Sequence, residues 1–141
     1  MATELQGFLT EWHRVVSEKD VGALSSLLAD DVSLGAPPYW ARIRSRELVH
    51  HLLGLILNTI EEFTYHREWQ KGSDLALEFT GRIGQFELQG IDLITLNDRF
   101  TIQDFDVLIR PANAVDHLRD IIAPQMASFI TRSNKGAVGR S

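Results

Sequence analysis

The chain has 141 residues, of which 44% are hydrophobic and 23% charged, and its formal net charge is -5. This length and balance suit one soluble globular domain and argue against a disordered chain. No basic stripe or Arg-rich helix is present, so we expect no nucleic acid partner. The sequence contains no cysteine, which excludes disulfides, thiolate metal sites and a cysteine nucleophile.

The N-terminal stretch MATELQGFLTEW lacks the basic region and the continuous apolar run of a secretory signal. The most apolar helical stretch, LVHHLLGLILNTI, holds two histidines and is too short to cross a bilayer. We therefore expect a cytoplasmic protein with no membrane partner.

Helices dominate the first part of the chain. Apolar residues at helical spacing predict an amphipathic helix over residues 3–18 and a second, short helix within residues 19–31 that is capped by Asp20. The stretch DVSLGAPP then reads as a short strand stopped by two prolines. A third helix is predicted from Ser45 to about Thr59.

After this helix the apolar period changes from helical to two. Four strands are predicted, at EEFTYHREWQ, DLALEFTGR, QFELQGIDLITL and FTIQDFDVLI. Short turn signals separate them, which is typical of an antiparallel meander. A last helix follows over residues 110–130, beginning near Asn113 and bent or broken at Pro124. We expect one domain over residues 1–131 and a disordered tail over residues 132–141.

This order of elements predicts an α+β fold. A curved, cone-shaped antiparallel sheet is expected to lie under the N-terminal helices and the C-terminal helix, and together these elements would enclose a cavity. The opposite face of the sheet carries Ile91, Leu93 and Leu108, which makes it more apolar than a solvated face. We therefore expect a homodimer that covers this outer face.

Three segments carry a resemblance to a known family. ADDVSLGAP resembles a short strand after the second helix, SRELVHHLL a helix start, and GIDLITLNDRFTIQDFDVLIRP a final hairpin of the nuclear transport factor 2-like superfamily. The chain is similar in particular to the SnoaL-like and ketosteroid isomerase-like branch. Because this fold hosts many unrelated functions, the resemblance implies architecture more firmly than activity.

The resemblance places Asp92 at the position of a pocket acid of the isomerases. It also places Ala36 where their catalytic base belongs and Trp12 where their hydrogen-bonding tyrosine belongs, so the isomerase reaction is not implied. Limonene-epoxide hydrolases of the same superfamily carry a carboxylate near the position of Val107, and that chemistry is not implied either.

Asp92 is the leading candidate for a catalytic residue, because strand alternation directs it to the same face as Ile94 and Leu96. As a neutral acid in an apolar cavity it would donate a hydrogen bond. The alternative is a structural acid bonded to Tyr65 or to a helix. His51 is the second catalytic candidate, since imidazoles titrate near neutrality, and a core or surface histidine is the alternative.

Aromatic side chains are the candidates for ligand contact, as in most small-molecule pockets. Tyr39 and Trp40 stand out because they follow two prolines in a loop. The full set is Trp12, Tyr39, Trp40, Tyr65, Trp69 and Phe86. Arg110 would hold an anionic group or pair with Asp106 or Glu78. No pair of histidines has metal-ligand spacing and no phosphate loop is present, so we expect no metal and no cofactor.

Three functions remain open at this point. The first is a cavity that binds a small hydrophobic molecule bearing a carbonyl or hydroxyl group. The second is a small acid/base enzyme of polyketide-cyclase or isomerase type, with Asp92 as its acid and His51 or Tyr65 as the partner. The third is a non-catalytic dimeric interaction module, which a cavity filled by side chains would favour.

Overall fold

The computed structural model describes the backbone of residues 2–138 and the side chains of residues 3–132. Helix α1 (Ala2–Glu18) leads into α2 (Val21–Leu24) and the 3-10 helix η1 (Ser25–Leu27). Asp20 caps α2 as predicted, because its side chain accepts a hydrogen bond of 3.1 Å from the backbone N–H of Ala23.

Strand β1 (Leu28–Gly35) precedes α3 (Arg46–Thr59), which starts at its predicted cap. The Ser45 hydroxyl accepts a hydrogen bond of 3.3 Å from the backbone N–H of Leu48. The second half of the chain forms a sheet of long strands, namely β2 (Glu61–Lys71), β3 (Asp74–Ile83), β4 (Phe86–Leu96) and β5 (Ile102–Arg110).

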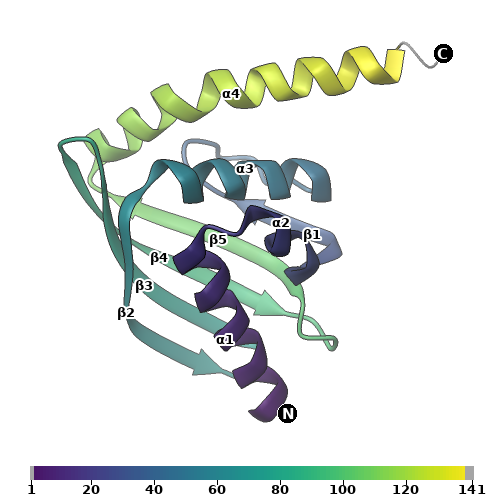
Figure 1. Ribbon diagram of the computed structural model, residues 1–141, viewed down its shortest axis with the longest axis vertical. Coiled ribbons are helices and arrows are strands. Elements are labelled where there is room, and N and C mark those ends of the chain that lie inside the picture. The colour runs from purple at the N-terminus through teal and green to yellow at the C-terminus, as the bar shows by residue number, and fades with distance from the viewer. Residues whose placement is uncertain (1, 139–141) are drawn as a thin grey trace.

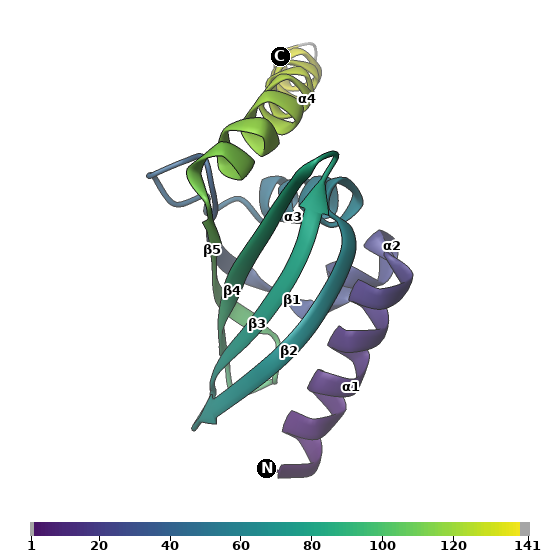
Figure 2. The same ribbon diagram turned by 90° about the vertical axis from the view of Figure 1, so that its left-hand side faces the viewer.

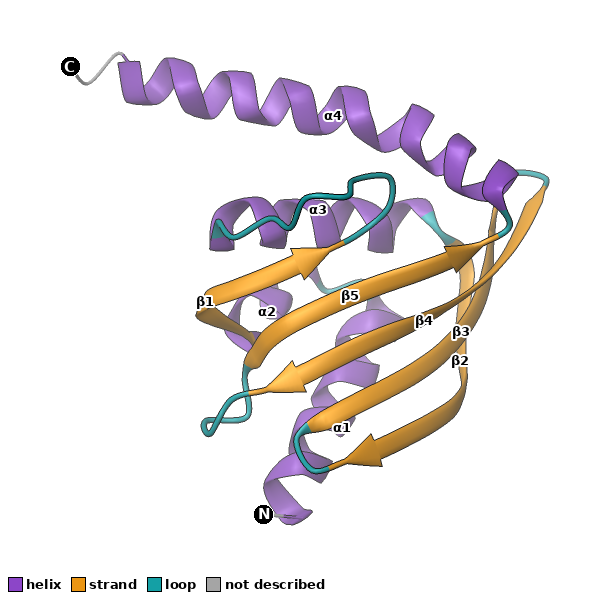
Figure 3. Cartoon of the chain, turned by 180° about the vertical axis from the view of Figure 1, so that it is seen from behind, coloured by secondary structure: helices purple, strands orange, loops and turns teal. Residues whose placement is uncertain are grey.

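The strand order in the sheet is β1-β5-β4-β3-β2 (Figure 3). Strands β2 to β5 form the predicted antiparallel meander, whereas β1 pairs parallel with β5, so the sheet is mixed. The chain passes along the covered face of the sheet through α3 before it enters β2 at the far edge (Figure 1). Strand β2 thus occupies one edge of the sheet, and β1 pairs with β5 at the opposite edge. The predicted α+β class with a curved sheet is confirmed.

Helices cover one face of the sheet only. Figure 2 shows the outer face toward the viewer, with α3 behind the strands, α1 beside β2 and α4 (Ala112–Val138) at one end. The core lies between the covered face and the helices. Its largest fully buried side chains are Phe79, Phe105, Leu9, Leu24, Leu34, Leu52, Ile60, Leu77, Ile94, Ile102, Leu118 and Ile122.

Helix α4 differs from its predicted form. It begins at Ala112 and continues through Pro124 to Val138, so of the two predicted forms, bent or broken at Pro124, the broken one is absent. The helix also extends into the segment predicted to be a disordered tail. Pro124 is exposed, whereas the side chains facing the body of the protein lie one turn apart, at Leu118, Ile122 and Met126. A proline on the solvent side loses one backbone hydrogen bond without disturbing that packing. Residues 139–141 lie outside the described part of the chain.

Candidate functional site: a buried carboxyl in an apolar cavity

Asp92 lies on β4 and points toward the helices, as the alternation of the strand predicts. Its neighbours across the sheet are Leu77 on β3 and Val107 on β5, both buried and apolar. Only 5% of Asp92 is exposed. A carboxyl in such surroundings needs a partner, because an unpaired buried charge is costly.

The partner is Tyr65 on β2. Its hydroxyl donates a hydrogen bond of 2.5 Å to Oδ2 of Asp92. The indole Nε1–H of Trp12, on α1, donates a second hydrogen bond of 3.0 Å to the same hydroxyl oxygen. A chain of two hydrogen bonds thus joins a helix to two strands that are not neighbours in the sheet.

Burial shifts the titration of both acidic groups. It raises the pKa of Asp92 from 3.8 to about 7, while the hydrogen bond from Tyr65 acts in the opposite direction. Burial and the nearby carboxyl raise the pKa of Tyr65 well above its ordinary value. Tyr65 therefore stays protonated, whereas Asp92 exchanges its proton near neutral pH.

The second carboxyl oxygen of Asp92 borders a cavity. In the described part of the chain, every fully buried side-chain oxygen or nitrogen has a hydrogen-bond partner. Oδ1 has no side-chain or backbone partner within residues 3–132, so it must be reached from the cavity. The residues that line this cavity are Trp12, Val15, Val16, Leu24, Leu53, Ile56, Leu57, Phe63, Tyr65, Phe79, Asp92, Phe105 and Val107.

The cavity is small and, apart from the three hydrogen-bonded residues, apolar. Its volume is about 30 Å³. A water molecule needs roughly 10 to 15 Å³ of such space, so the cavity has room for about two waters. The lining from α2 and α3 was not predicted, because the apolar stripe of a helix looks the same whether it borders a cavity or a filled core.

His51 lies away from this cavity. Its ring stacks on Phe129 of α4, with centroids 3.8 Å apart and planes inclined by 11°. Partial burial, Arg132 and His50 together lower its pKa. The predicted pairing of His51 with Asp92 is therefore not found, because the outer side of α3 faces α4 and not the sheet.

Tyr39 and Trp40 do not line the cavity either. They belong to the loop between β1 and α3, beside a separate groove that also contains Leu108 and Val115. Arg42 holds this loop against β5, since its guanidinium lies 2.5 Å from the carboxylate of Asp106. Trp40 is 98% exposed.

The last two predicted ligand-binding aromatics also lie elsewhere. Trp69 is on β2 and stacks under the guanidinium of Arg67, whose carbon is 5.1 Å from the indole centroid. Phe86 packs against the His117 ring of α4, with a centroid distance of 5.0 Å. Of the six aromatic residues, the structure brings only Trp12 and Tyr65 to the carboxyl.

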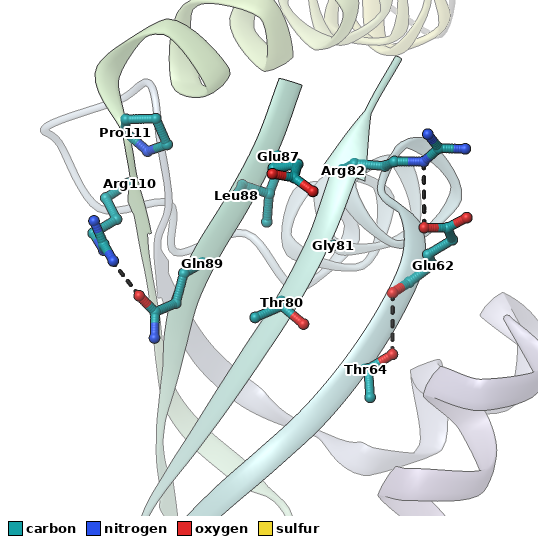
Figure 4. Close-up of a pocket in the computed structure, with 10 residues that line it drawn as sticks. All are labelled: Glu62, Thr64, Thr80, Gly81, Arg82, Glu87, Leu88, Gln89, Arg110 and Pro111. Atoms are coloured by element: carbon teal, nitrogen blue, oxygen red, sulfur yellow. Dashed lines mark hydrogen bonds and ion pairs between the residues drawn. The ribbon is translucent and has the colours of Figure 1, made fainter. Parts of the chain in front are cut away.

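The outer face of the sheet carries a polar groove near the start of α4 (Figure 4). Arg110 donates a hydrogen bond of 2.9 Å to Gln89, and not to Asp106 or Glu78 as predicted. Gln89 in turn donates to Glu78, which also forms a bidentate pair with Arg67 at 2.8 and 2.7 Å. This polar ladder crosses four strands, and Arg67 is the main cause that lowers the pKa of Glu78 to about 2.

The described residues contain neither a candidate metal site nor a candidate membrane-spanning helix. No group of three or more histidines, cysteines or carboxylates is placed to hold a metal ion there. No helix in that part of the chain combines the length and the hydropathy needed to span a bilayer.

The fold defines a class of proteins, the α+β domains in which helices cover one face of a curved sheet. A steroid delta-isomerase from Pseudomonas aeruginosa is 31% identical over 91% of this chain and 95% of its own, with a TM-score of 0.84. A protein with a cystatin-like fold from Silicibacter pomeroyi is 34% identical over 94% and 92% of the two chains, with a TM-score of 0.80.

A putative ketosteroid isomerase from Kribbella flavida shares the fold, with a TM-score of 0.63 at 16% identity over 78% of this chain and 80% of its own. No protein-family model matches the sequence, and no curated protein matches it. The chain belongs to the nuclear transport factor 2-like superfamily, in its SnoaL-like and ketosteroid isomerase-like branch.

Proposed function

We propose that this protein binds a small, largely apolar molecule through one hydrogen bond to Asp92. One observation carries the proposal: a carboxyl oxygen faces a cavity whose other walls are almost entirely apolar. A carboxyl placed only for stability would have both oxygens satisfied by the protein, because an unmet buried acceptor is costly. The free oxygen therefore supports a ligand that completes the site.

The likeness to the steroid delta-isomerase supports a carbonyl compound as the ligand. A neutral Asp92 would donate a hydrogen bond to the carbonyl oxygen, and would do so in largely apolar surroundings. Since the pKa of Asp92 is about 7, the donor form is well populated in mildly acidic and neutral solution. The cavity holds only about 30 Å³, so a larger ligand needs the lining side chains to move apart.

Catalysis of the isomerase type is the second possibility within this site. Proton transfer between two carbons needs a base as well as an acid. Ala36, at the position that the resemblance assigns to the base, is buried in a separate groove, and Asp92 is the sole carboxylate among the cavity residues described above. An acid-assisted reaction in which water or the substrate supplies the base fits this arrangement.

A dimeric interaction module is the alternative outside the cavity. The small volume of the cavity favours it, as does the outer face of the sheet, where Leu93 and Leu108 are 40% and 56% exposed. Side chains of this kind in the middle of a sheet face are typical of an interface between subunits. We propose that a homodimer forms through this face, whether or not the cavity binds a ligand.

Binding of cyclohexanone and of methylcyclohexane, followed by NMR, tests the cavity proposal. The ketone is expected to shift the Trp12 indole resonance and to bind more tightly than the hydrocarbon. Asp92→Leu, which replaces the carboxyl by an apolar group of similar size, should remove that preference, whereas Asp92→Asn should retain part of it. Absence of binding by either probe would count against a ligand site and for the interaction module. An unchanged preference in Asp92→Leu would show that the ketone is recognised by a group other than Asp92.

A further inference from the structure

We propose that Trp12 is a positioning residue which, through Tyr65, turns the acidic proton of Asp92 toward the cavity. The inference rests on the proposed ligand site and deepens it, because the direction of that proton decides which chemical groups the site accepts. It depends on which atoms are able to donate along the chain from Trp12 to Asp92, and on the two distances that define this chain.

Each hydrogen bond in the chain has a fixed direction. An indole Nε1–H can only donate, so Tyr65 Oη must be the acceptor of the bond from Trp12 at 3.0 Å. The phenolic hydrogen of Tyr65 then has one partner within reach, Oδ2 of Asp92 at 2.5 Å. Oδ2 therefore receives a hydrogen bond, and the acidic proton of a neutral Asp92 is left on Oδ1.

Oδ1 is the oxygen that borders the cavity, so the cavity meets an O–H group when Asp92 is neutral and a bare carboxylate oxygen when it is ionised. The neutral form accepts ligands with a hydrogen-bond acceptor, such as a ketone, an aldehyde or an ester carbonyl. The ionised form accepts ligands with a donor, such as an alcohol or an amine. Trp12 donates to Tyr65 and Tyr65 donates to Asp92, so no other polar group of the lining competes for the ligand.

The Trp12 ring also contributes to packing, and the test must distinguish that contribution from its hydrogen bond to Tyr65. Its ring lies 6.2 Å from that of Phe8 and 5.5 Å from that of Phe105. Trp12→Phe keeps an aromatic ring in this cluster and removes only the Nε1–H and part of the ring volume. Phe8→Leu is the matched control, because it disturbs the same cluster without touching the hydrogen-bond chain.

The test measures the pKa of Asp92 by carboxyl ¹³C NMR in the ligand-free protein. A hydrogen bond received by Tyr65 makes its own O–H a stronger donor, by about 10 to 30% per bond. Loss of the Trp12 donor should therefore raise the pKa of Asp92 by a few tenths of a pH unit. Tyr65→Phe should raise it further, and Phe8→Leu should leave it unchanged.

The decisive comparison is the double variant. If Trp12 acts through Tyr65, Trp12→Phe has no further effect on the pKa of Asp92 in the Tyr65→Phe background. The proposal is overturned if Trp12→Phe shifts the pKa of Asp92 equally in both backgrounds, or if it causes no shift in the wild-type background. A second measurement needs no Trp12 variant: the Trp12 indole N–H resonance of the wild type should titrate with Asp92, and this titration should vanish in Tyr65→Phe.

Binding of cyclohexanone at pH 5.5 and pH 8.5 separates this inference from the ligand site itself. The wild type should bind the ketone more tightly at the lower pH, and Trp12→Phe should reduce this difference. If the pKa values follow the predicted cycle and the ketone never binds, the positioning role stands and the ligand proposal fails. If the ketone binds with the same pH dependence in both proteins, the ligand site stands and the positioning role fails.

Discussion

The ring of Phe79 lies directly over Gly90, and its Cζ occupies the space that a Cβ at position 90 would need. A Cβ built on Gly90 would lie 2.4 Å from that atom and 2.4 Å from the carbonyl oxygen of Leu108. Both distances are far below van der Waals contact. Gly90 therefore allows Phe79 to pack flat against β4, two residues before Asp92 and within the cavity wall.

Gly90→Ala should destabilise the protein by roughly 1 to 3 kcal/mol, the usual cost of overpacking a core. Gly7, on the exposed side of α1 with no atom within 4 Å of a built Cβ, is the matched control. Gly7→Ala should stabilise by roughly 0.5 to 1 kcal/mol, because alanine loses less entropy in a helix. Urea unfolding of both variants measures these changes, and a neutral Gly90→Ala would show that both Phe79 and the backbone at Leu108 can shift.

Asp92 should make the stability of the protein depend on pH. Because its pKa rises from 3.8 in the unfolded chain to about 7 in the fold, the folded state binds more protons between these values. Stability therefore falls as pH rises through this window, and above pH 7 the full cost is on the order of 4 kcal/mol. Asp92→Asn cannot titrate, so it should become steadily more stable relative to the wild type from pH 5 to pH 8.

Urea unfolding at pH 5, 6.5 and 8 checks this expectation. The range avoids the titration of Glu78, whose pKa falls from 4.5 to about 2 and whose contribution is lost only as pH drops below 4.5. Parallel curves for wild type and Asp92→Asn would contradict a raised pKa. They would indicate that Asp92 is ionised in the fold throughout this range.

The outer face of the sheet should hold two subunits together. Leu108→Glu places a charge among the exposed apolar side chains of that face and should convert a dimer to a monomer at tens of micromolar protein. Ile130→Glu, at an exposed apolar residue of α4, is the control and should leave the dimer intact. Light scattering over a concentration series distinguishes them, and a wild type that is already monomeric would refute the dimer.

Two ion pairs of the sheet should contribute unequally to stability, one within the polar ladder and one outside it. Arg67 pairs with Glu78, whose side chain is 8% exposed, whereas Arg82 pairs with Glu62, whose side chain is 70% exposed. Arg67→Gln leaves a shielded carboxylate without its cation and should lower the melting temperature clearly. Arg82→Gln should lower it little, since exposed ion pairs contribute almost nothing. Equal losses would mean that Glu78 keeps enough contact with water to need no partner.

The protein should not isomerise β,γ-unsaturated ketosteroids above the rate of buffer. The cavity supplies an acid but no second carboxylate within its described lining, and Ala36 lies outside that lining. A spectrophotometric assay of conjugated enone formation checks this, with the isomerase from Pseudomonas aeruginosa as a positive control. Clear turnover would show that another group acts as the base.

Strand alternation was sufficient to orient Asp92, because a two-residue period has only two possible faces. It could not identify the bond from Trp12 to Tyr65, since this bond depends on how α1 is rotated against the edge strand β2. The prediction that His51 faces Asp92 was wrong for a related reason. A helix packed between a sheet and another helix has two buried sides, and the apolar pattern of α3 does not say which of them faces the sheet.

Two further features could not be predicted from the sequence, namely the parallel pairing of β1 with β5 and the small volume of the cavity. Pairing at a sheet edge depends on where α3 delivers the chain, and cavity volume depends on rotamers that no periodicity encodes. The overall class was accessible because helical and alternating segments occupy separate halves of the chain.

A single carboxyl oxygen fixes one point of a bound molecule and leaves its rotation about that point free. Apolar walls resist such rotation only where their outline matches the ligand. A site of this kind therefore distinguishes molecules by the group at one end and by overall length, and discriminates poorly between mirror images. Racemic mixtures of a chiral ketone would accordingly be taken up with little preference for either hand.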